Sequence, residues 1–336
     1  MNGIPMGRPL LPPAKMLMPY LSRIDENRWY TNYGPLVQEY EQRLSEVFQC
    51  YVAATSSCTS GMTAALLAQE IHGEVFLPSW TFVATANAAR AAGLSVSLTD
   101  VDEMYWTPPD TDIVVAPFGA PVRYEDEVMT DAAGGFDAFF TGQSKAGAAP
   151  IVISTHATKV FSTGEGGLVL STDKALVGRV RALVNHGIDD DRAVPLTGIN
   201  GKLSEYGAAL GLAELDNWAW KRNAWLDLKR KYLAAFGSLS HTTPLSSLSW
   251  VGSVFCLRLP EGERVRESLV SQGIASRKVY GDGVHRYGAY ARCEKEPLPV
   301  TEALAKEVVF LPYSIDTTDA ELERIVEAVQ EARGHE

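Results

Sequence analysis

One lysine has an unusual setting in the segment STHATKVFSTGEGG, residues 154–167. Lys159 follows a short apolar stretch, PIVISTH, that is typical of a strand, and it precedes a cluster of glycines. Asp131 lies at the end of an earlier apolar stretch, EVMTDAA. Ligands of open α/β sheets collect at the carboxyl ends of strands, and a buried carboxylate there requires a cation or several donors. An aspartate at a strand end can also be a helix cap or a turn residue, so the prediction of a site rests on the two residues together.

Pyridoxal phosphate (PLP) is a cofactor that requires this pair. An acidic partner keeps its ring nitrogen protonated, and a lysine holds its aldehyde as a Schiff base. PLP also needs a phosphate site, and the segment SSCTSGMTAAL (56–66) offers a small-residue turn entering a helix. Serine and threonine also cap helices that bind nothing. Trp80 and Phe82, at a strand-to-helix turn, offer an aromatic plate for the ring, although either could instead belong to the core.

The bulk composition excludes several partners. With 336 residues the chain is longer than one core usually supports, so two lobes are expected. Its formal charge of −11 and pI of about 5.1 argue against nucleic acid or an anionic membrane as the main partner. No stretch approaches about 18 uninterrupted apolar residues and no apolar signal core is evident, so we expect a cytoplasmic protein without a membrane span. The four cysteines match neither a disulfide framework nor a metal site, so no metal is expected.

The order of apolar segments predicts the architecture. From residue 36 onward, near-continuous apolar strands alternate with helices, which is typical of a three-layer α/β domain with a mainly parallel sheet. We expect this large domain to span residues 36–236 and to end in a long helix from about Ser204 to Phe236. Residues 1–35 are rich in proline and are expected to form an arm. Residues 237–336 mix strands and helices and predict a smaller α+β domain.

Phosphate turn, aromatic residue, aspartate and lysine occur in the order expected for a fold type I PLP-dependent transferase. The sequence resembles the DegT/StrS family of PLP-dependent sugar aminotransferases over most of its length. The segments that carry this resemblance are TNYGPLVQEYE (31–41), PSWTFVATANA (78–88), DAA (131–133), STHATKVFSTGEGGLVLS (154–171), RALVNHG (181–187), GINGKLSEYGAALGLAEL (198–215) and LPVTEALAKEVVFLPY (298–313).

The resemblance implies a role for each matching residue. Lys159 would form the internal aldimine and move the proton between substrate and cofactor, and Asp131 would pair with the ring nitrogen. Phe82, rather than Trp80, falls at the ring-stacking position. Asn200 matches a position that reaches the phosphate of a neighbouring subunit, which implies a homodimer with shared active sites. The phosphate would be held in the same subunit by Gly61, Met62, Thr63 and Ser154.

The sequence also departs from the family pattern. Gly134 stands where the family usually has a glutamine or histidine directed to the hydroxyl side of the cofactor. Met62 replaces a threonine of the phosphate turn, and Lys202 replaces an arginine. Two crossover helices of the family are expected to be absent. The segment DVDEMYWTPPDTDIVVAPFG (100–119) leads almost directly from one strand to the next, and residues 122–130 are too few for a helix and a strand. We therefore expect thin cover on one face of the sheet, to be filled by the arm, a partner subunit or another protein.

The resemblance implies a PLP-dependent aminotransferase that moves an amino group from L-glutamate or glutamine to a keto-sugar, most simply a nucleotide-linked one. Another PLP reaction, such as elimination or dehydration, a non-sugar keto metabolite, and a non-catalytic scaffold remain alternatives. Lys159 speaks against the family's sugar dehydratases, which replace that lysine. Four residues are candidates for substrate contact, although each could equally be structural: His156, Arg277, Tyr280 and His285.

Overall fold

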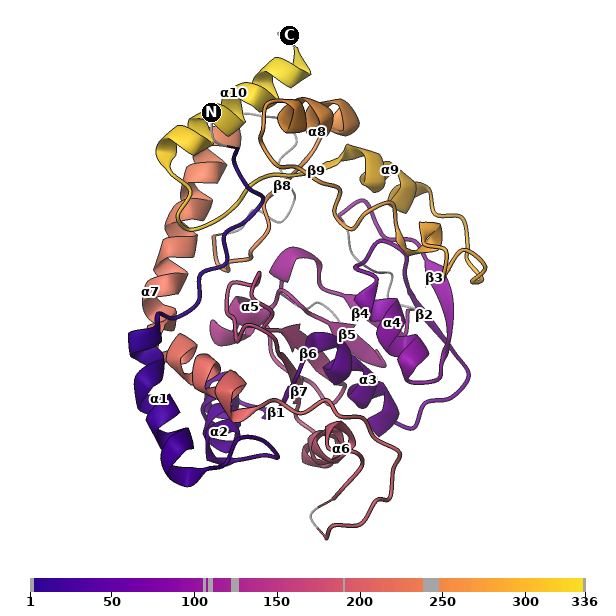
Figure 1. Cartoon of the computed structure of the whole chain (residues 1–336). Helices are drawn as coiled ribbons and strands as arrows, with labels where there is room; N and C mark the ends of the chain where they lie inside the picture. Colours follow the sequence, from indigo (N-terminus) through magenta and orange to yellow (C-terminus); the bar gives the residue numbers. More distant parts are fainter. Residues whose placement is uncertain are drawn as a thin grey trace.

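The central sheet brings the predicted chemistry to one edge (Figure 1). The computed structural model describes residues 3–104, 107, 111–121, 127–189, 191–237 and 248–334. Its strands are β1 (Tyr51–Thr55), β2 (Glu74–Pro78), β3 (Ser95–Thr99), β4 (Ile113–Val115), β5 (Met129–Asp131), β6 (Ile151–Ser154), β7 (Gly167–Ser171), β8 (Cys256–Arg258) and β9 (Val308–Phe310). Its α-helices are α1 (Ala14–Asn27), α2 (Pro35–Phe48), α3 (Cys58–Ala68), α4 (Ala84–Ala91), α5 (Phe136–Phe140), α6 (Lys174–Val184), α7 (Glu205–Phe236), α8 (Gly262–Ser271), α9 (Pro299–Glu307) and α10 (Asp319–Arg333).

The strand order explains why Asp131 and Ser154 are neighbours. Five strands pair in the order β1-β7-β6-β5-β4, and β4, β5 and β6 are parallel. β7 runs antiparallel to both β6 and β1, and β2 and β3 form a parallel pair. The Phe76 amide in β2 donates to the carboxylate of Asp112, just before β4, at 2.8 Å. Because parallel strands end at the same edge, the last residues of β5 and β6 face one site.

Helices cover both faces of the sheet, as the sequence predicted. On one face α2, α5 and α7 pack against alternate strand residues such as Ile151 and Ile153. On the other, α3, α4 and α6 pack against Val152, between them, and Val169. The period-two alternation of strand side chains therefore divides the core between two layers of helices. The C-terminal lobe, built from the antiparallel pair β8–β9 and helices α8, α9 and α10, lies above the strand ends (Figure 1).

The two short crossovers do not leave the sheet bare. In the described part of the β3–β4 and β4–β5 connections, the one helical element is a 3₁₀ turn, Pro117–Gly119. Residues 122–126, on which part of the expectation rests, lie outside the described residues. Every residue of β4 and β5 is nevertheless buried within this chain. The expectation of thin cover is therefore wrong, because Ile113 of β4 and Met129 of β5 pack in the core with α3 and α4. Beside them, Trp80 and Phe118 form a second small core with Val279 of the C-terminal lobe.

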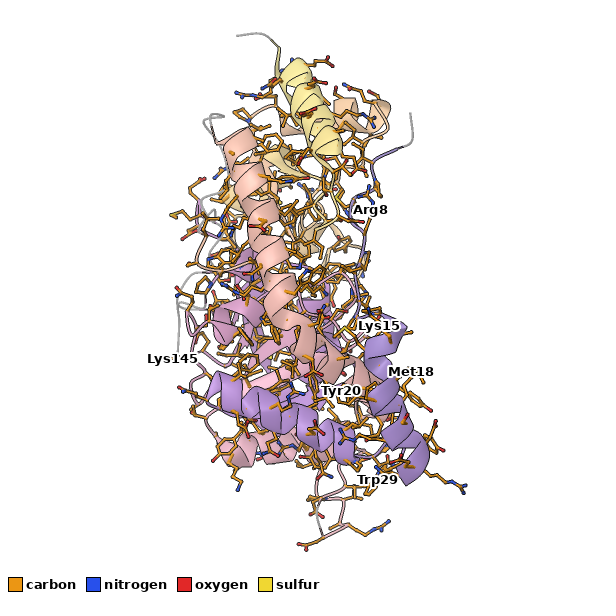
Figure 2. All side chains as sticks on the ribbon, turned by 90° about the vertical axis from the view of Figure 1, so that its left-hand side faces the viewer. Arg8, Lys15, Met18, Tyr20, Trp29 and Lys145 are labelled. Carbon is orange, nitrogen blue, oxygen red and sulfur yellow. The ribbon has the colours of Figure 1, made fainter. Side chains whose placement is uncertain are left out.

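The arm of residues 3–13 runs along the C-terminal lobe (Figure 2). Ile4 pairs with Ile274 in a parallel bridge, and Arg8 forms ion pairs with Glu321 and Asp316. The arm then enters α1, which packs against α7. Within the described residues, no helix combines the length and the apolar character that crossing a bilayer requires.

Gly134 follows β5 at a point where two backbone segments meet. A Cβ atom built on Gly134 would lie 2.8 Å from the amide nitrogen of Gly119, and one built on Gly119 would lie 2.5 Å from the carbonyl oxygen of Gly134. Gly119 also has a φ of +88°, which disfavours any side chain. The backbone of the 3₁₀ turn thus occupies the space that a side chain at residue 134 would need.

We predict that Gly134→Ala destabilises the protein by about 2–4 kcal/mol, because neither backbone segment can move aside cheaply. Gly178→Ala is the matched control, since nothing lies within 4 Å of a Cβ at that exposed helical position. It should leave stability unchanged or raise it by up to about 1 kcal/mol. Urea unfolding of the three proteins measures both effects, and equal stability of Gly134→Ala and wild type would contradict the packing described above.

A buried lysine on α7 fixes the segment that leads into the C-terminal lobe. Lys229 is 5% exposed, and its Nζ donates to the carbonyl of Trp250 at 2.9 Å. The same nitrogen lies 4.0 Å from the centroid of the Trp250 ring. Asp137, paired with Arg222, accepts the amide of Val251 at 2.8 Å. Burial lowers the pKa of Lys229 from 10.5 to about 8, against an opposing effect of the Asp137 charge.

This lowered pKa predicts a pH-dependent stability. Between about pH 8 and 10.5 the unfolded chain binds more protons at Lys229 than the native protein, so stability attributable to this group rises with pH. From about pH 7.5 to about pH 9.5, wild type should gain on the order of 1–2 kcal/mol relative to Lys229→Met in chemical denaturation. The control Lys231→Met removes a half-exposed lysine of the same helix and should retain the wild-type slope. If the stability of wild type and of Lys229→Met depended on pH in the same way, Lys229 would not have the lowered pKa.

Candidate active site

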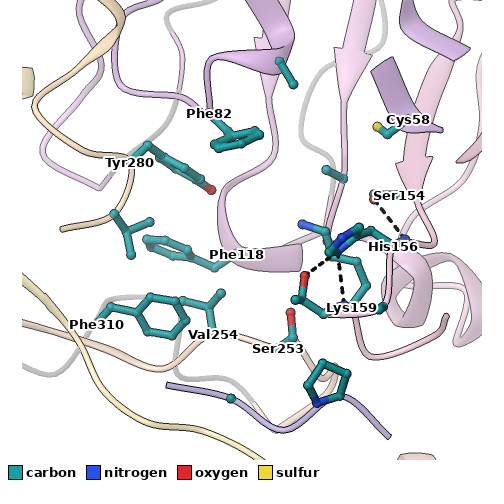
Figure 3. Close-up of a pocket in the computed structure, with 18 of the residues that line it drawn as sticks. Cys58, Phe82, Phe118, Ser154, His156, Lys159, Ser253, Val254, Tyr280 and Phe310 are labelled. Carbon is teal, nitrogen blue, oxygen red and sulfur yellow. Dashed lines mark hydrogen bonds between the residues drawn. The ribbon is translucent and has the colours of Figure 1, made fainter. Parts of the chain in front are cut away.

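A cavity of about 770 Å³ opens at the carboxyl edge of the sheet, below the C-terminal lobe. Its floor comes from the ends of β4, β5 and β6 and the start of α3, and its other walls from the arm and the C-terminal lobe. Figure 3 shows Phe82, Tyr280 and Phe118 along one side and Cys58 and Ser154 along the other, with Lys159 between them. Both predicted catalytic residues, Asp131 and Lys159, line this cavity.

Lys159 lies in a tightly bonded turn between β6 and β7. Its amide donates to the carbonyl of His156 at 2.8 Å, and the Ala157 amide donates to Gly164 at 2.8 Å. A Cβ on Gly166 would lie 2.4 Å from the hydroxyl of Thr155, which explains one glycine of the cluster. The Lys159 side chain is half-buried, and within the described residues its Nζ makes no hydrogen bond or ion pair. A rigid turn therefore presents an amine that is free to react.

Asp131 presents a buried carboxylate to the same cavity. It is 5% exposed, and its Oδ2 accepts from the Thr85 hydroxyl at 2.7 Å while Oδ1 accepts from the Ala133 amide at 3.0 Å. Burial raises the pKa of Asp131, and these two bonds and the charge of Lys159 oppose that rise. Each oxygen keeps acceptor capacity for a further partner. A cationic ring nitrogen would supply the missing compensation.

The start of α3 lies at one end of the cavity, before Gly61, Met62 and Thr63, to which the resemblance assigns the phosphate. The helix begins at Cys58, and Ser57 and Ser60 form a capping box. Ser57, Cys58 and Thr59 line the cavity, and the amides of Cys58 and Thr59 in the first turn have no partner within the helix.

Gly61, Met62 and Thr63 lie in the next turn of this helix. The Gly61 amide already donates to the Ser57 carbonyl at 3.0 Å, and the Thr63 hydroxyl to the Thr59 carbonyl at 2.9 Å. The side chain of Met62 still lines the cavity, whereas Gly61 and Thr63 do not. The backbone amides available for a phosphate are therefore those of Cys58 and Thr59. Ser154, at the end of β6, lies beside them (Figure 3).

The two aromatic candidates, Phe82 and Trp80, differ in exposure. Phe82 is 62% exposed and lines the cavity, so its ring offers a free face. Trp80 is 1% exposed and packs edge-on against Phe118 and Tyr280. The structure therefore places Phe82 where a flat ligand can stack and Trp80 in the core beneath it.

The substrate candidates divide in the same way. His156, Arg277 and Tyr280 line the cavity, and Arg277 lies over the Phe310 ring at 5.8 Å. The His156 Nδ1 accepts the Thr158 amide at 3.2 Å, so its Nε2, which faces Glu165 at 3.6 Å, carries the proton. His285 does not line the cavity: it is buried, and its Nδ1 lies 2.7 Å from the Ser79 hydroxyl.

Asn200 also lies away from the cavity, on an exposed loop, where its side-chain oxygen accepts from Lys202 at 2.6 Å. The described residues hold no group of three or more histidine, cysteine, aspartate or glutamate side chains suited to a metal ion.

Several cavity residues were missed by reasoning from sequence. The arm contributes Met6 to Leu10, the turn after β4 contributes Phe118, and the entry to the C-terminal lobe contributes Ser253 and Val254. The capping pattern of Ser57 and Ser60 was a visible signal for the start of α3. No sequence pattern marks Phe118 or Ser253, since both reach the cavity through tertiary packing.

Comparison with known proteins agrees with this geometry. Residues 14–116 and 122–330 match the model of the DegT/DnrJ/EryC1/StrS aminotransferase family. The dTDP-4-amino-4,6-dideoxy-D-glucose transaminase of Shigella dysenteriae is 29% identical over 97% of this chain and 98% of its own. GDP-perosamine synthase of Caulobacter vibrioides is 27% identical over 93% of this chain and 94% of its own. The crystal structure of DesI with its TDP-sugar product superposes with a TM-score of 0.86, at 27% identity, covering 99% of this chain and 95% of DesI.

These matches confirm the expected fold type I architecture and the expectation of a PLP-dependent aminotransferase. The residues also fit that cofactor, because a free amine, an under-compensated buried carboxylate, free helix amides and an exposed aromatic face line one cavity. The chain belongs to the DegT/DnrJ/EryC1/StrS aminotransferase family.

Proposed function

We propose that this enzyme moves an amino group from L-glutamate or glutamine to the keto group of a nucleotide-linked sugar. The observation that carries the proposal is the free amine of Lys159 in one cavity with the buried carboxylate of Asp131. The sugar acceptor is supported by the two relatives, whose names are those of nucleotide-sugar enzymes, and by the TDP-sugar product of DesI.

Each proposed cofactor contact uses a group that the fold leaves available. Asp131 would hold the ring nitrogen, Phe82 would stack on the ring, and the start of α3 with Ser154 would hold the phosphate. When bound, PLP supplies an electron sink for the bond that breaks at the amine-bearing carbon. Lys159 would then carry the proton, since its side chain is half-buried beside the cavity and free of partners among the described residues.

The mouth of the cavity has a cation suited to a charged substrate group. Arg277 is exposed, lines the cavity and makes no ion pair within the described part of the chain. Its neighbour Lys278 is different, because Asp282 and Glu263 already neutralise it. A guanidinium binds a carboxylate or phosphate with two parallel hydrogen bonds, so Arg277 is the proposed contact for the donor's carboxylate or the acceptor's phosphate.

A homodimer in the cytoplasm is part of the proposal. Asn200 does not line the cavity of its own chain, and the side chains of Lys202 and His186 lie close to it on the surface. Such a donor-rich group is suited to contact an anion on a second copy of the chain, as the sequence resemblance implies.

The first test is the absorbance spectrum of the protein with PLP, before and after L-glutamate. Wild type should show the visible band of lysine-bound PLP, and glutamate should convert it to the shorter-wavelength amine form. Lys159→Ala should lose the band and at least about 10³-fold in transamination rate. Lys145→Ala, which removes an exposed lysine outside the cavity, should behave as wild type. A band that glutamate leaves unchanged would overturn L-glutamate as the donor, and no band in folded wild type would overturn the enzyme assignment.

A second prediction concerns the support of Asp131. Thr85→Val removes one of the two hydrogen bonds to the carboxylate, so the pKa of Asp131 should rise further and PLP affinity should fall about tenfold. Equilibrium titration of the apoprotein with PLP measures the affinity. The same substitution at Thr141, whose hydroxyl bonds its own helix, should have no effect. Unchanged affinity in Thr85→Val would show that Asp131 needs no such support.

A further inference from the structure

The phenol of Tyr280 lies on the side of the cavity opposite the start of α3. The Tyr280 ring stacks on Phe118, with 6.0 Å between centroids and 15° between planes, and packs edge-on against Trp80 at 5.2 Å. The hydroxyl points toward the interior of the cavity, on the same side as Phe82 (Figure 3). Two aromatic residues thus fix the ring that carries this hydroxyl.

The surroundings of this hydroxyl favour its role as a hydrogen-bond donor. The hydroxyl lies in the cavity, where its hydrogen can be donated to an acceptor on a ligand. The Asp131 charge acts on the phenol, so the two groups lie in one electrostatic neighbourhood. Burial raises the pKa of Tyr280, so the phenol remains a protonated donor at neutral pH.

The neighbouring backbone at Gly119 carries no competing side chain. Phe118 is followed by Gly119, whose backbone fills the space beside Gly134. Ala116 and Ala133, which also line the cavity, are apolar. Ser253 also lines it and follows Gly252, on which a Cβ would lie 2.3 Å from the Phe118 carbonyl oxygen. Tyr280 and Ser253 are therefore the two side-chain hydroxyls to compare on this side.

The chemistry of PLP identifies what such a donor would meet. On the PLP ring the phosphate arm and the hydroxyl lie on either side of the carbonyl-bearing carbon. With the phosphate at α3, the ring nitrogen at Asp131 and the carbonyl carbon at Lys159, the hydroxyl oxygen must face the side away from α3. Phe118 and Tyr280 occupy that side (Figure 3).

We propose that the Tyr280 hydroxyl donates a hydrogen bond to the ring oxygen of PLP and thereby sets the protonation of the lysine-bound nitrogen next to it. The inference rests on the proposed function and adds a cofactor-contacting residue from the C-terminal lobe. It gives the missing side chain at Gly134 a replacement from a distant part of the chain. The C-terminal lobe thus takes part in tuning the cofactor.

The test is a pH titration of the visible absorbance of the PLP-loaded protein. The donated hydrogen bond stabilises negative charge on the ring oxygen. That charge is least compensated when the neighbouring nitrogen has lost its proton, so the bond favours the deprotonated form and lowers the titration midpoint. Tyr280→Phe keeps the aromatic packing and removes the donor, so the titration midpoint should rise by about one pH unit. Tyr287→Phe is the matched control, because it removes another hydroxyl that lines the cavity and should leave the midpoint unchanged.

The outcomes separate the two proposals. Asp131, His156, Cys58 and Arg277 line the cavity and are the same in every variant, so a difference in midpoint reports the substituted hydroxyl. Absence of a visible band in wild type would overturn the proposed function. A normal band whose midpoint is unchanged in Tyr280→Phe would overturn the role of Tyr280 alone. The same conclusion would follow if the midpoint shifted in Ser253→Ala, which removes the hydroxyl of Ser253, and not in Tyr280→Phe. Thermal unfolding of each variant checks that the fold is retained.

Discussion

The buried carboxylate of Asp131 is the constraint around which the site is arranged. A carboxylate removed from water is costly, and the two hydrogen bonds from Thr85 and the Ala133 amide compensate it only in part. The remainder must come from a cation in the cavity. The parallel register of β5 and β6 brings the lysine-bearing turn to the same edge, so Lys159 supplies part of that positive charge. A protonated ring nitrogen would complete it.

The sequence was sufficient for the parts of the site that depend on strand ends. Asp131 and Lys159 each follow an apolar run whose length and composition indicate a strand, and parallel strands bring their ends together. The resemblance assigned the phosphate to Gly61, Met62 and Thr63, which lie after the first residue of α3, and the run from Ser56 to Ser60 contains several residues able to cap a helix. The structure selects Ser57, whose reciprocal bond with Ser60 closes a capping box. Local pattern thus predicted the element, and only the hydrogen bonds fixed its first residue.

Gly134 shows a second limit of the sequence. Its lack of a side chain was visible, but the reason was not, since the Gly119 backbone that fills the space belongs to another connection. The short crossovers likewise suggested an uncovered sheet, whereas Trp80, Phe118 and Val279 form a local core with the C-terminal lobe. Contacts between segments distant in sequence leave no periodic trace in either segment. Such contacts could therefore be identified only from the structure.

A buried ion pair links the reactive turn to the arm. Glu214 on α7 accepts the amide of Ser162, three residues after the lysine, and pairs with Lys221, which donates to the carbonyl of Leu10 at 2.5 Å. Both charges are buried, so the pair is expected to add little net stability. Its effect is instead positional: one helix fixes both the turn that presents Lys159 and the arm that walls the cavity. The long helix α7 therefore positions two segments of the site that the sheet does not hold.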